Sequence, residues 1–105
     1  MTYQQTFEAL ADPTRRAIFE KLKSGPCAVA EIAQHQPVSR PAVSQHLKVL
    51  HSAGLVDAKQ VGTRRYYSVR REGLSELREW VNSFWTDILE NYASHIRQQM
   101  EKYNG

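Results

Sequence analysis

Glycine and proline residues divide the first 70 residues of the chain into short segments, and this division restricts the fold more than any other feature. Asp12-Pro13 begins a second helix after a first one at Tyr3–Ala11, because aspartate can cap a helix and proline is tolerated in its first turn. Ser24-Gly25-Pro26 ends that second helix, since glycine caps helices and proline cannot continue them. The pattern predicts four short helices, near residues 3–11, 13–23, 28–34 and 39–52, with Gly54 ending the last.

The residues after Gly54 carry a strand pattern and then a long helical one. Two stretches rich in β-branched residues and tyrosine, Leu55–Val61 and Arg65–Arg70, flank Gly62-Thr63-Arg64, which predicts a β-hairpin. From Glu72 onward, apolar residues recur at helical spacing. A hairpin that follows two closely spaced helices forms a wing, so the predicted fold is a winged helix-turn-helix. It is mainly α with a β-hairpin: four helices, two strands and a long final helix.

Chain length and apolar content fit one domain. With 105 residues and 41% hydrophobic residues, the chain can build one modest core, which predicts a single domain over residues 1–105. Its body is expected at residues 3–71 and a dimerisation helix at residues 72–103. No run approaches the roughly 18 consecutive apolar residues of a membrane span, and residues 1–7 lack the layout of a secretory signal. The sequence therefore predicts a cytoplasmic protein with no membrane partner.

The basic residues are concentrated in the middle of the chain. The formal net charge is +3, but seven of the 14 basic residues and one acidic residue, Asp57, lie between His35 and Arg71. Such a surface suits a polyanion, and a chain without lipid signals favours nucleic acid over a membrane. A solvated basic face is the alternative that charge alone leaves open.

The fourth helix carries one apolar and one basic side. Ser39 can cap it, and Val43, Leu47 and Leu50 share its apolar side. The opposite side has no acidic residue, whereas an ordinary surface helix mixes both signs of charge. A helix that exposes only cations and short hydrogen-bonding side chains is typical of a ligand for a DNA groove. The residues on this side are Arg40, Ser44, Gln45, Lys48 and His51.

Two kinds of DNA contact are expected from these residue types. Ser44 and Gln45 can donate and accept hydrogen bonds and so can read base edges, while Arg40 can read bases or bind a phosphate. Cations on the hairpin suit phosphate or minor-groove contacts, although one of the paired arginines could instead pack on a tyrosine. Of Tyr66 and Tyr67, one is expected in the core and the other toward the fourth helix. The predicted DNA-binding residues are Arg40, Pro41, Ser44, Gln45, Lys48, Thr63, Arg64 and Arg65.

Several motifs together resemble a known family. Ala-Asp-Pro-Thr-Arg at 11–15, Ala-Val-Ser-Gln-His-Leu at 42–47 and Ala-Gly-Leu-Val at 53–56 occur in the order seen in the arsenic-repressor (ArsR/SmtB) family of winged helix-turn-helix transcriptional regulators. The resemblance covers residues 7–69. The segment LREWVNSFW at 77–85 further resembles a metal-independent branch that includes autorepressors. The resemblance implies a repressor of an operator in double-stranded DNA, with the fourth helix and hairpin on DNA and the first and last helices pairing two chains.

The metal sites of that family lack their ligands in this sequence. Its Cys-Val-Cys in the third helix reads Ala28-Val29-Ala30 here, and the single cysteine, Cys27, lies one position earlier. The last helix offers Asp87-Ile88-Leu89 and His95-Ile96-Arg97-Gln98 where the family uses Asp-x-His and His-x-x-Glu. We therefore expect no metal and no cofactor. Redox sensing at Cys27 and an unidentified small-molecule effector stay open.

The last helix is too apolar for a small core to cover. Isologous pairing of two chains is the commonest way to bury such a surplus, so a homodimer is predicted. Its predicted interface residues are Phe7, Leu10, Trp80, Val81, Phe84, Trp85 and Ile88.

Other function classes have weaker support. An enzyme is not expected, because the sequence has no glycine-rich phosphate loop and no locally supported Ser-His-acid arrangement. A winged helix used for protein contacts fits the fold equally well, but its fourth helix should then be apolar or acidic, and here it is basic.

Overall fold

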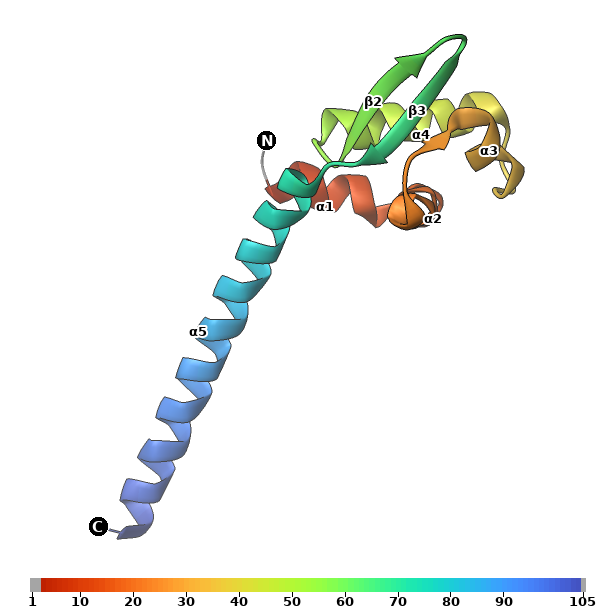
Figure 1. The fold of residues 1–105 in the computed structure, drawn as a ribbon. Coiled ribbons are helices and arrows are strands. Elements are labelled where there is room, and N and C mark those ends of the chain that lie inside the picture. Colours follow the sequence, from red (N-terminus) through yellow and green to blue (C-terminus); the bar gives the residue numbers. More distant parts are fainter. Residues whose placement is uncertain (1–2, 105) are drawn as a thin grey trace.

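The computed structural model describes residues 3–104 and contains the predicted order of four helices, a hairpin and a long last helix (Figure 1). A short third strand, β1, and a 3-10 turn, η1, are added to this order. The elements are α1 (Tyr3–Ala11), α2 (Pro13–Lys21), η1 (Leu22–Ser24), β1 (Cys27–Ala28), α3 (Val29–Gln34), α4 (Arg40–Ser52), β2 (Val56–Val61), β3 (Arg64–Val69) and α5 (Arg71–Asn104).

Side-chain caps begin two of the helices where the sequence predicts them. The Asp12 carboxylate accepts a hydrogen bond of 2.9 Å from the backbone N–H of Arg15, and a proline follows it at the start of α2. The Ser39 hydroxyl accepts one of 3.3 Å from the N–H of Ala42 in α4. Each cap satisfies one of the N–H groups that have no partner within the first turn of a helix.

Gly54 ends α4 and turns the chain toward the wing. Its φ of 76° lies in the left-handed region, which glycine adopts without a steric penalty. The N–H of Leu55 donates to the carbonyl of Leu50 and the N–H of Gly54 to that of His51, both at 3.0 Å. This pair of bonds is the Schellman motif, and it fixes where β2 leaves the helix.

The sheet has three antiparallel strands in the order β1-β3-β2. The predicted hairpin is present, but its turn contains two residues, Gly62-Thr63, because Arg64 already pairs with Val61. The expected helix start at Ala28 is also wrong by one residue, since Ala28 pairs with Tyr66 of β3. Local sequence could not show this pairing, because the two residues are far apart along the chain.

Within residues 3–104, one hydrophobic core lies between α1, α2, α3, α4 and the sheet. The apolar side of α4 predicted from the sequence, Val43, Leu47 and Leu50, is fully buried in it. The other large, fully buried side chains are Ile18, Leu22, Ile32, Leu55 and Val56. This core holds α4 with its polar side outward.

The helix α5 leaves this body and carries most of its apolar side chains uncovered (Figure 1). The molecule measures 74 × 25 × 23 Å, and its radius of gyration of 20.0 Å exceeds the roughly 13 Å expected of a compact chain of this length. No helix within residues 3–104 is long and apolar enough to cross a membrane.

Aromatic rings join α5 to α1 within the same chain. The ring of Trp80 meets that of Phe7 edge-on at 5.0 Å between centroids and stacks on that of Phe84 at 5.6 Å. Leu10 is half-buried against the core of its own chain. Phe7 and Leu10 therefore have contacts within their own chain. The sequence-based prediction places their contacts only across the two-fold axis of a dimer.

Candidate nucleic-acid interface

The polar side of α4 is presented as the sequence predicts. Arg40, Pro41, Gln45 and Lys48 are exposed, and Ser44 is half-buried. Arg40 and Pro41 lie in the first turn of the helix, next to its N-terminus. Backbone N–H groups and the positive end of the helix dipole favour anions at such a position.

The wing lies beside α4, and a cavity of about 530 Å³ separates the two elements. Ser44 and Lys48 line it from the helix, and Arg65 lines it from β3. Gln45 lies outside this cavity, on the exposed side of the helix. The structure thus brings part of the predicted set together around one polar hollow and leaves Gln45 free of it. The remaining lining residues are Val29, His51, Ser52 and Tyr67.

Arg65 is held by the phenol of Tyr67. Its Nε donates a hydrogen bond of 3.1 Å to the hydroxyl of Tyr67, and its guanidinium carbon lies 5.6 Å from the centre of that ring. The two residues are two positions apart on β3, so their side chains lie on the same face of the strand. The acceptor is neutral, and the positive charge of Arg65 therefore stays uncompensated.

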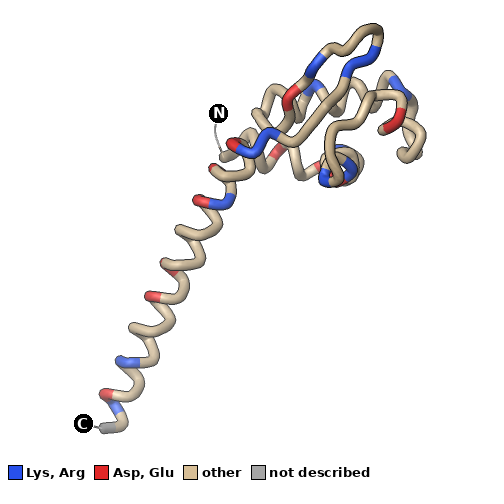
Figure 2. The backbone as a smooth tube through the Cα atoms, viewed as in Figure 1, with Lys and Arg blue, Asp and Glu red and all other residues tan. Residues whose placement is uncertain are grey.

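Arg64 has a different partner. Its Nη2 makes an ion pair of 3.0 Å with Oε1 of Glu31 in α3, and both side chains are about half exposed. Its Nη1 lies 3.5 Å from the hydroxyl of Tyr66. The wing carries several basic positions, and an acidic one lies on the neighbouring α3 (Figure 2). Glu31 therefore offsets the charge of Arg64 but not that of Arg65.

The two tyrosines differ from what the sequence suggested. Tyr67 is 5% exposed and belongs to the core, and it also lines the cavity that faces α4. Tyr66 is half-buried in a separate hollow beside Pro26 and Lys59. Tyr67 therefore both packs in the core and faces α4, whereas the sequence predicted one tyrosine for each position.

Arg15 and Arg16 hold α1 against α2. The Nε of Arg15 donates to the carbonyl of Ala9 at 2.5 Å, and Nη1 of Arg16 donates to that of Leu10 at 3.0 Å. These are the last carbonyls of α1, where positive side chains are favourable. A structural role accounts for both arginines.

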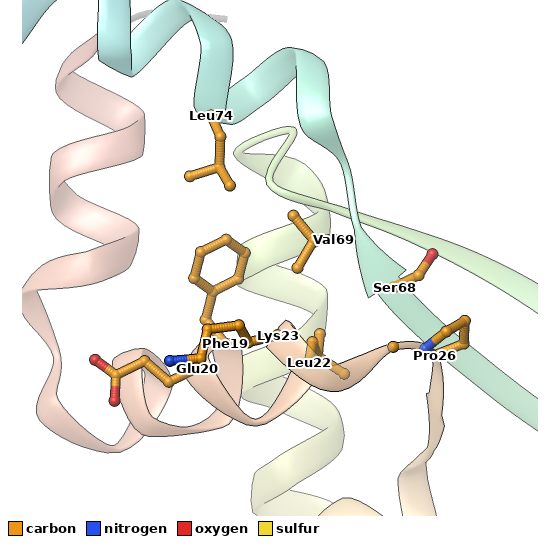
Figure 3. A pocket seen from close by; sticks show the side chains of 9 residues that line it. Phe19, Glu20, Leu22, Lys23, Pro26, Ser68, Val69 and Leu74 are labelled. Atoms are coloured by element: carbon orange, nitrogen blue, oxygen red, sulfur yellow. The ribbon is translucent and has the colours of Figure 1, made fainter.

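An apolar cavity of about 460 Å³ lies outside the α4–wing face (Figure 3). Phe19 of α2, Val69 of β3 and Leu74 of α5 point toward one another across it. Glu20 and Lys23 also line it. This cavity joins the base of α5 to the body but shares no residue with the basic side of α4.

The residues at the family's metal positions do not fit a thiophilic ion. Ala28 is 2% exposed and paired in the sheet, and Cys27 is a free, half-buried cysteine packed against the core. Among residues 3–104 there is no group of three or more His, Cys, Asp or Glu side chains that could hold a metal. Soft ions prefer several thiolate ligands, and this chain offers one thiol.

Sequence reasoning missed Glu31, and it expected one arginine to pack on a tyrosine, whereas Arg64 lies over Tyr66 and Arg65 over Tyr67. The spacing of Arg65 and Tyr67 on one strand was a usable signal for their contact. Glu31 gave none, because its partner is 33 positions away and the two meet only through the fold.

A helix-turn-helix formed by α3 and α4, a wing and an acid-free helix face together define a winged helix-turn-helix DNA-binding protein. Residues 12–58 match the model of the family described as "Bacterial regulatory protein, arsR family". The chain belongs to this ArsR family and is a transcriptional regulator with a DNA-binding helix-turn-helix. Such regulators are not enzymes, which agrees with the expectation from the sequence.

Three similar proteins support this assignment. The HTH-type transcriptional regulator Rv2034 of Mycobacterium tuberculosis is 54% identical over 92 residues, which are 88% of this chain and 86% of the relative. The transcriptional repressor SdpR of Bacillus subtilis is 36% identical over 74% of this chain and 87% of its own length. The solution structure of the homodimeric winged helix-turn-helix DNA-binding domain of Mb0332 from Mycobacterium bovis has a TM-score of 0.65 and 32% identity, over 80% of this chain and 78% of the other.

Proposed function

We propose that this regulator is a repressor that binds an inverted-repeat operator as a homodimer, with α4 in the major groove and the wing along the flanking backbone. The observation that carries the proposal is the exposed side of α4, which has cations and short polar side chains and no acid. A major groove admits a helix, and side chains that donate and accept hydrogen bonds distinguish its base pairs. The proposed DNA contacts are Arg40, Pro41, Ser44, Gln45, Lys48, Thr63, Arg64 and Arg65.

The homodimer is supported by the uncovered side of α5. Trp85 is 60% exposed and Phe84 is 56% exposed, although aromatic side chains of this size are normally buried. The similarity to a homodimeric domain also supports the homodimer, and the similarity to a repressor supports the repressor role. A two-fold protein requires two half-sites about 34–36 Å apart, so the operator is proposed to be an inverted repeat. We further propose that this DNA-binding regulator acts in the cytoplasm.

Binding to the promoter region of the protein's own gene tests the proposal. Fluorescence anisotropy should show tighter binding to this fragment than to a shuffled duplex of the same composition. Lys48→Glu should abolish binding, because it adds an acid to the side of α4 that faces DNA. Lys102→Glu makes the same charge change on the exposed far end of α5 and should bind normally. Equal, weak binding of both duplexes by the wild type would instead support a protein-contact module.

A further inference from the structure

We propose that Tyr67 is a positioning residue that holds Arg65 over the cavity beside α4, where Arg65 and Lys48 together receive one phosphate of the DNA backbone. Glu31 keeps Arg64 out of this contact. The inference deepens the proposed function and rests on it, since it states which of the two wing arginines binds the phosphate at the cavity beside α4 and what selects it.

Tyr67 is fixed more firmly than any other residue of the cavity. Its side chain is 5% exposed, the most buried of those that line the cavity. Its position in β3 is paired with Cys27 on one side and Ala58 on the other. A ring packed in this way cannot change rotamer without opening the core. Its hydroxyl is therefore an acceptor at a fixed point at the edge of the cavity.

Arg65 is oriented through this acceptor without losing its capacity to bind a phosphate. The hydrogen bond uses Nε alone. Within residues 3–104, the two terminal nitrogens of Arg65 have no hydrogen-bond or ion-pair partner. These nitrogens can donate two parallel hydrogen bonds to a phosphate, and this bidentate geometry makes arginine a strong phosphate ligand. A neutral acceptor leaves the full positive charge available for this contact.

Lys48 approaches the same hollow from α4. It lines the cavity together with Arg65, so the two cations come from different elements that the core holds in place. Ser44 adds a hydroxyl donor to the lining. A phosphodiester carries one negative charge and two exposed oxygens, which suits two cations and one neutral donor.

Arg64 occupies an environment that opposes a contact with the phosphate at this cavity. Its ion pair with Glu31 offsets its charge, and a DNA phosphate would have to displace that carboxylate. Arg64 also points away from the cavity, since it does not line it and is adjacent to Arg65 on a strand with alternating side chains. The two arginines therefore differ in charge compensation and in direction, although they are neighbours in sequence.

Binding to a 30-base-pair duplex of arbitrary sequence tests the inference, because phosphate contacts need no operator. Arg65→Ala should weaken binding at least tenfold and reduce the slope of log affinity against log salt by about two for a dimer. Tyr67→Phe keeps the ring and the charge of Arg65, so affinity should fall three- to tenfold with the slope unchanged. The double variant should bind no more weakly than Arg65→Ala, because Tyr67 acts through Arg65.

Matched variants on the other face complete the test. Tyr66→Phe removes the hydroxyl beside Arg64 and should bind as the wild type does, and Arg64→Ala should change the salt slope by less than half as much as Arg65→Ala. Glu31→Gln should strengthen binding. Additive effects of Tyr67→Phe and Arg65→Ala, or an Arg64→Ala slope equal to that of Arg65→Ala, would overturn the inference. A wild type that binds no duplex DNA at low salt would overturn the proposed function instead.

Discussion

Individual side chains on α4 differ in what they can contribute to DNA binding. Gln45 is neutral, exposed and outside the cavity, and its amide both donates and accepts hydrogen bonds, which suits the recognition of a base edge. Lys48 is a point charge that lines the cavity with Arg65. Base edges are distinguished by donor and acceptor pattern, whereas a phosphate contact is the same at every sequence. Substitution of Gln45 should therefore change sequence specificity, and substitution of Lys48 should change the affinity for DNA of any sequence.

Gln45→Ala should reduce discrimination between operator and shuffled duplex, whereas Lys48→Ala should weaken binding to both. A readout contact is worth roughly 1–3 kcal/mol against the wrong base in each half-site, and each lost phosphate contact lowers the salt slope by about one unit. Binding curves for both duplexes at several salt concentrations measure the two effects. If Gln45→Ala lowered both affinities equally and Lys48→Ala only that of the operator, the roles would be reversed.

Asp12 should make stability depend on pH in the acid range. The hydrogen bond from the backbone N–H of Arg15 holds the pKa of Asp12 below the 3.8 of an unperturbed aspartate. A lowered pKa in the folded state means that the stabilisation is complete above about pH 4 and is lost as pH falls through the folded-state value. Asp12→Asn keeps a capping oxygen that does not titrate. Its Tm should lie below that of the wild type at pH 7, and the difference between the two should shrink as the pH falls below 3.8.

The control for this prediction is Asp12→Ala, which removes the cap entirely. It should unfold at a lower temperature than Asp12→Asn over the whole pH range. A difference between wild type and Asp12→Asn that did not change between pH 7 and pH 3 would show that the carboxylate charge contributes nothing to the cap.

For individual residues, the sequence predicts the interactions that depend only on residues nearby in the chain. The caps at Asp12 and Ser39 are confirmed, because a cap needs only the residue and the next three positions. The contact of Arg64 with Glu31 was not predictable, since it requires β3 to be placed beside α3. Whether Tyr66 or Tyr67 faces α4 was equally undetermined, because strand alternation gives two faces without naming the buried one.

The elements are joined by a close backbone contact at the start of α5. A side-chain carbon added to Gly73 would lie 2.3 Å from the carbonyl oxygen of Gly54 and 3.4 Å from the Cα of Leu55. The N–H of Arg70 also donates to the carbonyl of Leu55 at 2.8 Å. Only glycine allows the first turn of α5 to approach the α4–β2 turn so closely.

Gly73→Ala should destabilise the protein despite the better helix propensity of alanine. The substitution gains up to about 1 kcal/mol in propensity, but the new methyl group meets backbone that the end of α4 holds in place, and overpacking of this kind costs about 1–3 kcal/mol. Thermal unfolding should show a lower Tm. Ser75→Ala, at an exposed position of the same helix turn, should have the same Tm as the wild type or a slightly higher one. An unchanged Tm for Gly73→Ala would mean that α5 can shift away from the α4–β2 turn without a loss of stability, which would contradict the prediction.

The order of elements was predictable because periodicity and turn residues are local, and all four helices, the hairpin and the last helix are confirmed. The strand β1 was not. Its two residues are too few to show a pattern, and they become a strand only by pairing with Tyr66 and Tyr67. The close contact at Gly73 was not predictable either. A single glycine in a helix only indicates lower helix stability unless the backbone that packs against it is known.

At the scale of the whole molecule, the helix α5 extends far beyond the part of it that contacts the body. Its 34 residues correspond to about 51 Å of helix, and its contacts with the body include Gly73 in the first turn and Trp80, which meets Phe7. The apolar stripe continues beyond Trp80 through Ile88 to Tyr103, and no other element among residues 3–104 covers it. An isolated helix with such a face would associate, and a second copy gives it a symmetric and saturable partner.

Trp85→Asp should therefore dissociate the proposed dimer and greatly weaken operator binding. Trp85 is 60% exposed in the single chain, so its replacement leaves the core and the α4–wing face unchanged, and circular dichroism should show a folded protein. Across a two-fold axis the new carboxylates would be desolvated close to each other, and the dimer dissociation constant should rise at least about 100-fold, which corresponds to about 2.7 kcal/mol. Sedimentation velocity over a range of concentrations measures this change.

Ser83→Asp is the matched control, because it introduces the same charge two positions away, about 200° around the helix on the exposed side opposite Trp85. It should sediment as a dimer and bind the operator as the wild type does. Loss of half of the contacts should also make residual DNA binding by Trp85→Asp insensitive to the spacing of the two half-sites, whereas the wild type should lose affinity when that spacing departs from one helical turn. A wild-type protein that sediments as a monomer at micromolar concentration, or a Trp85→Asp dimer with normal operator affinity, would contradict the assignment of this face of α5 to dimerisation.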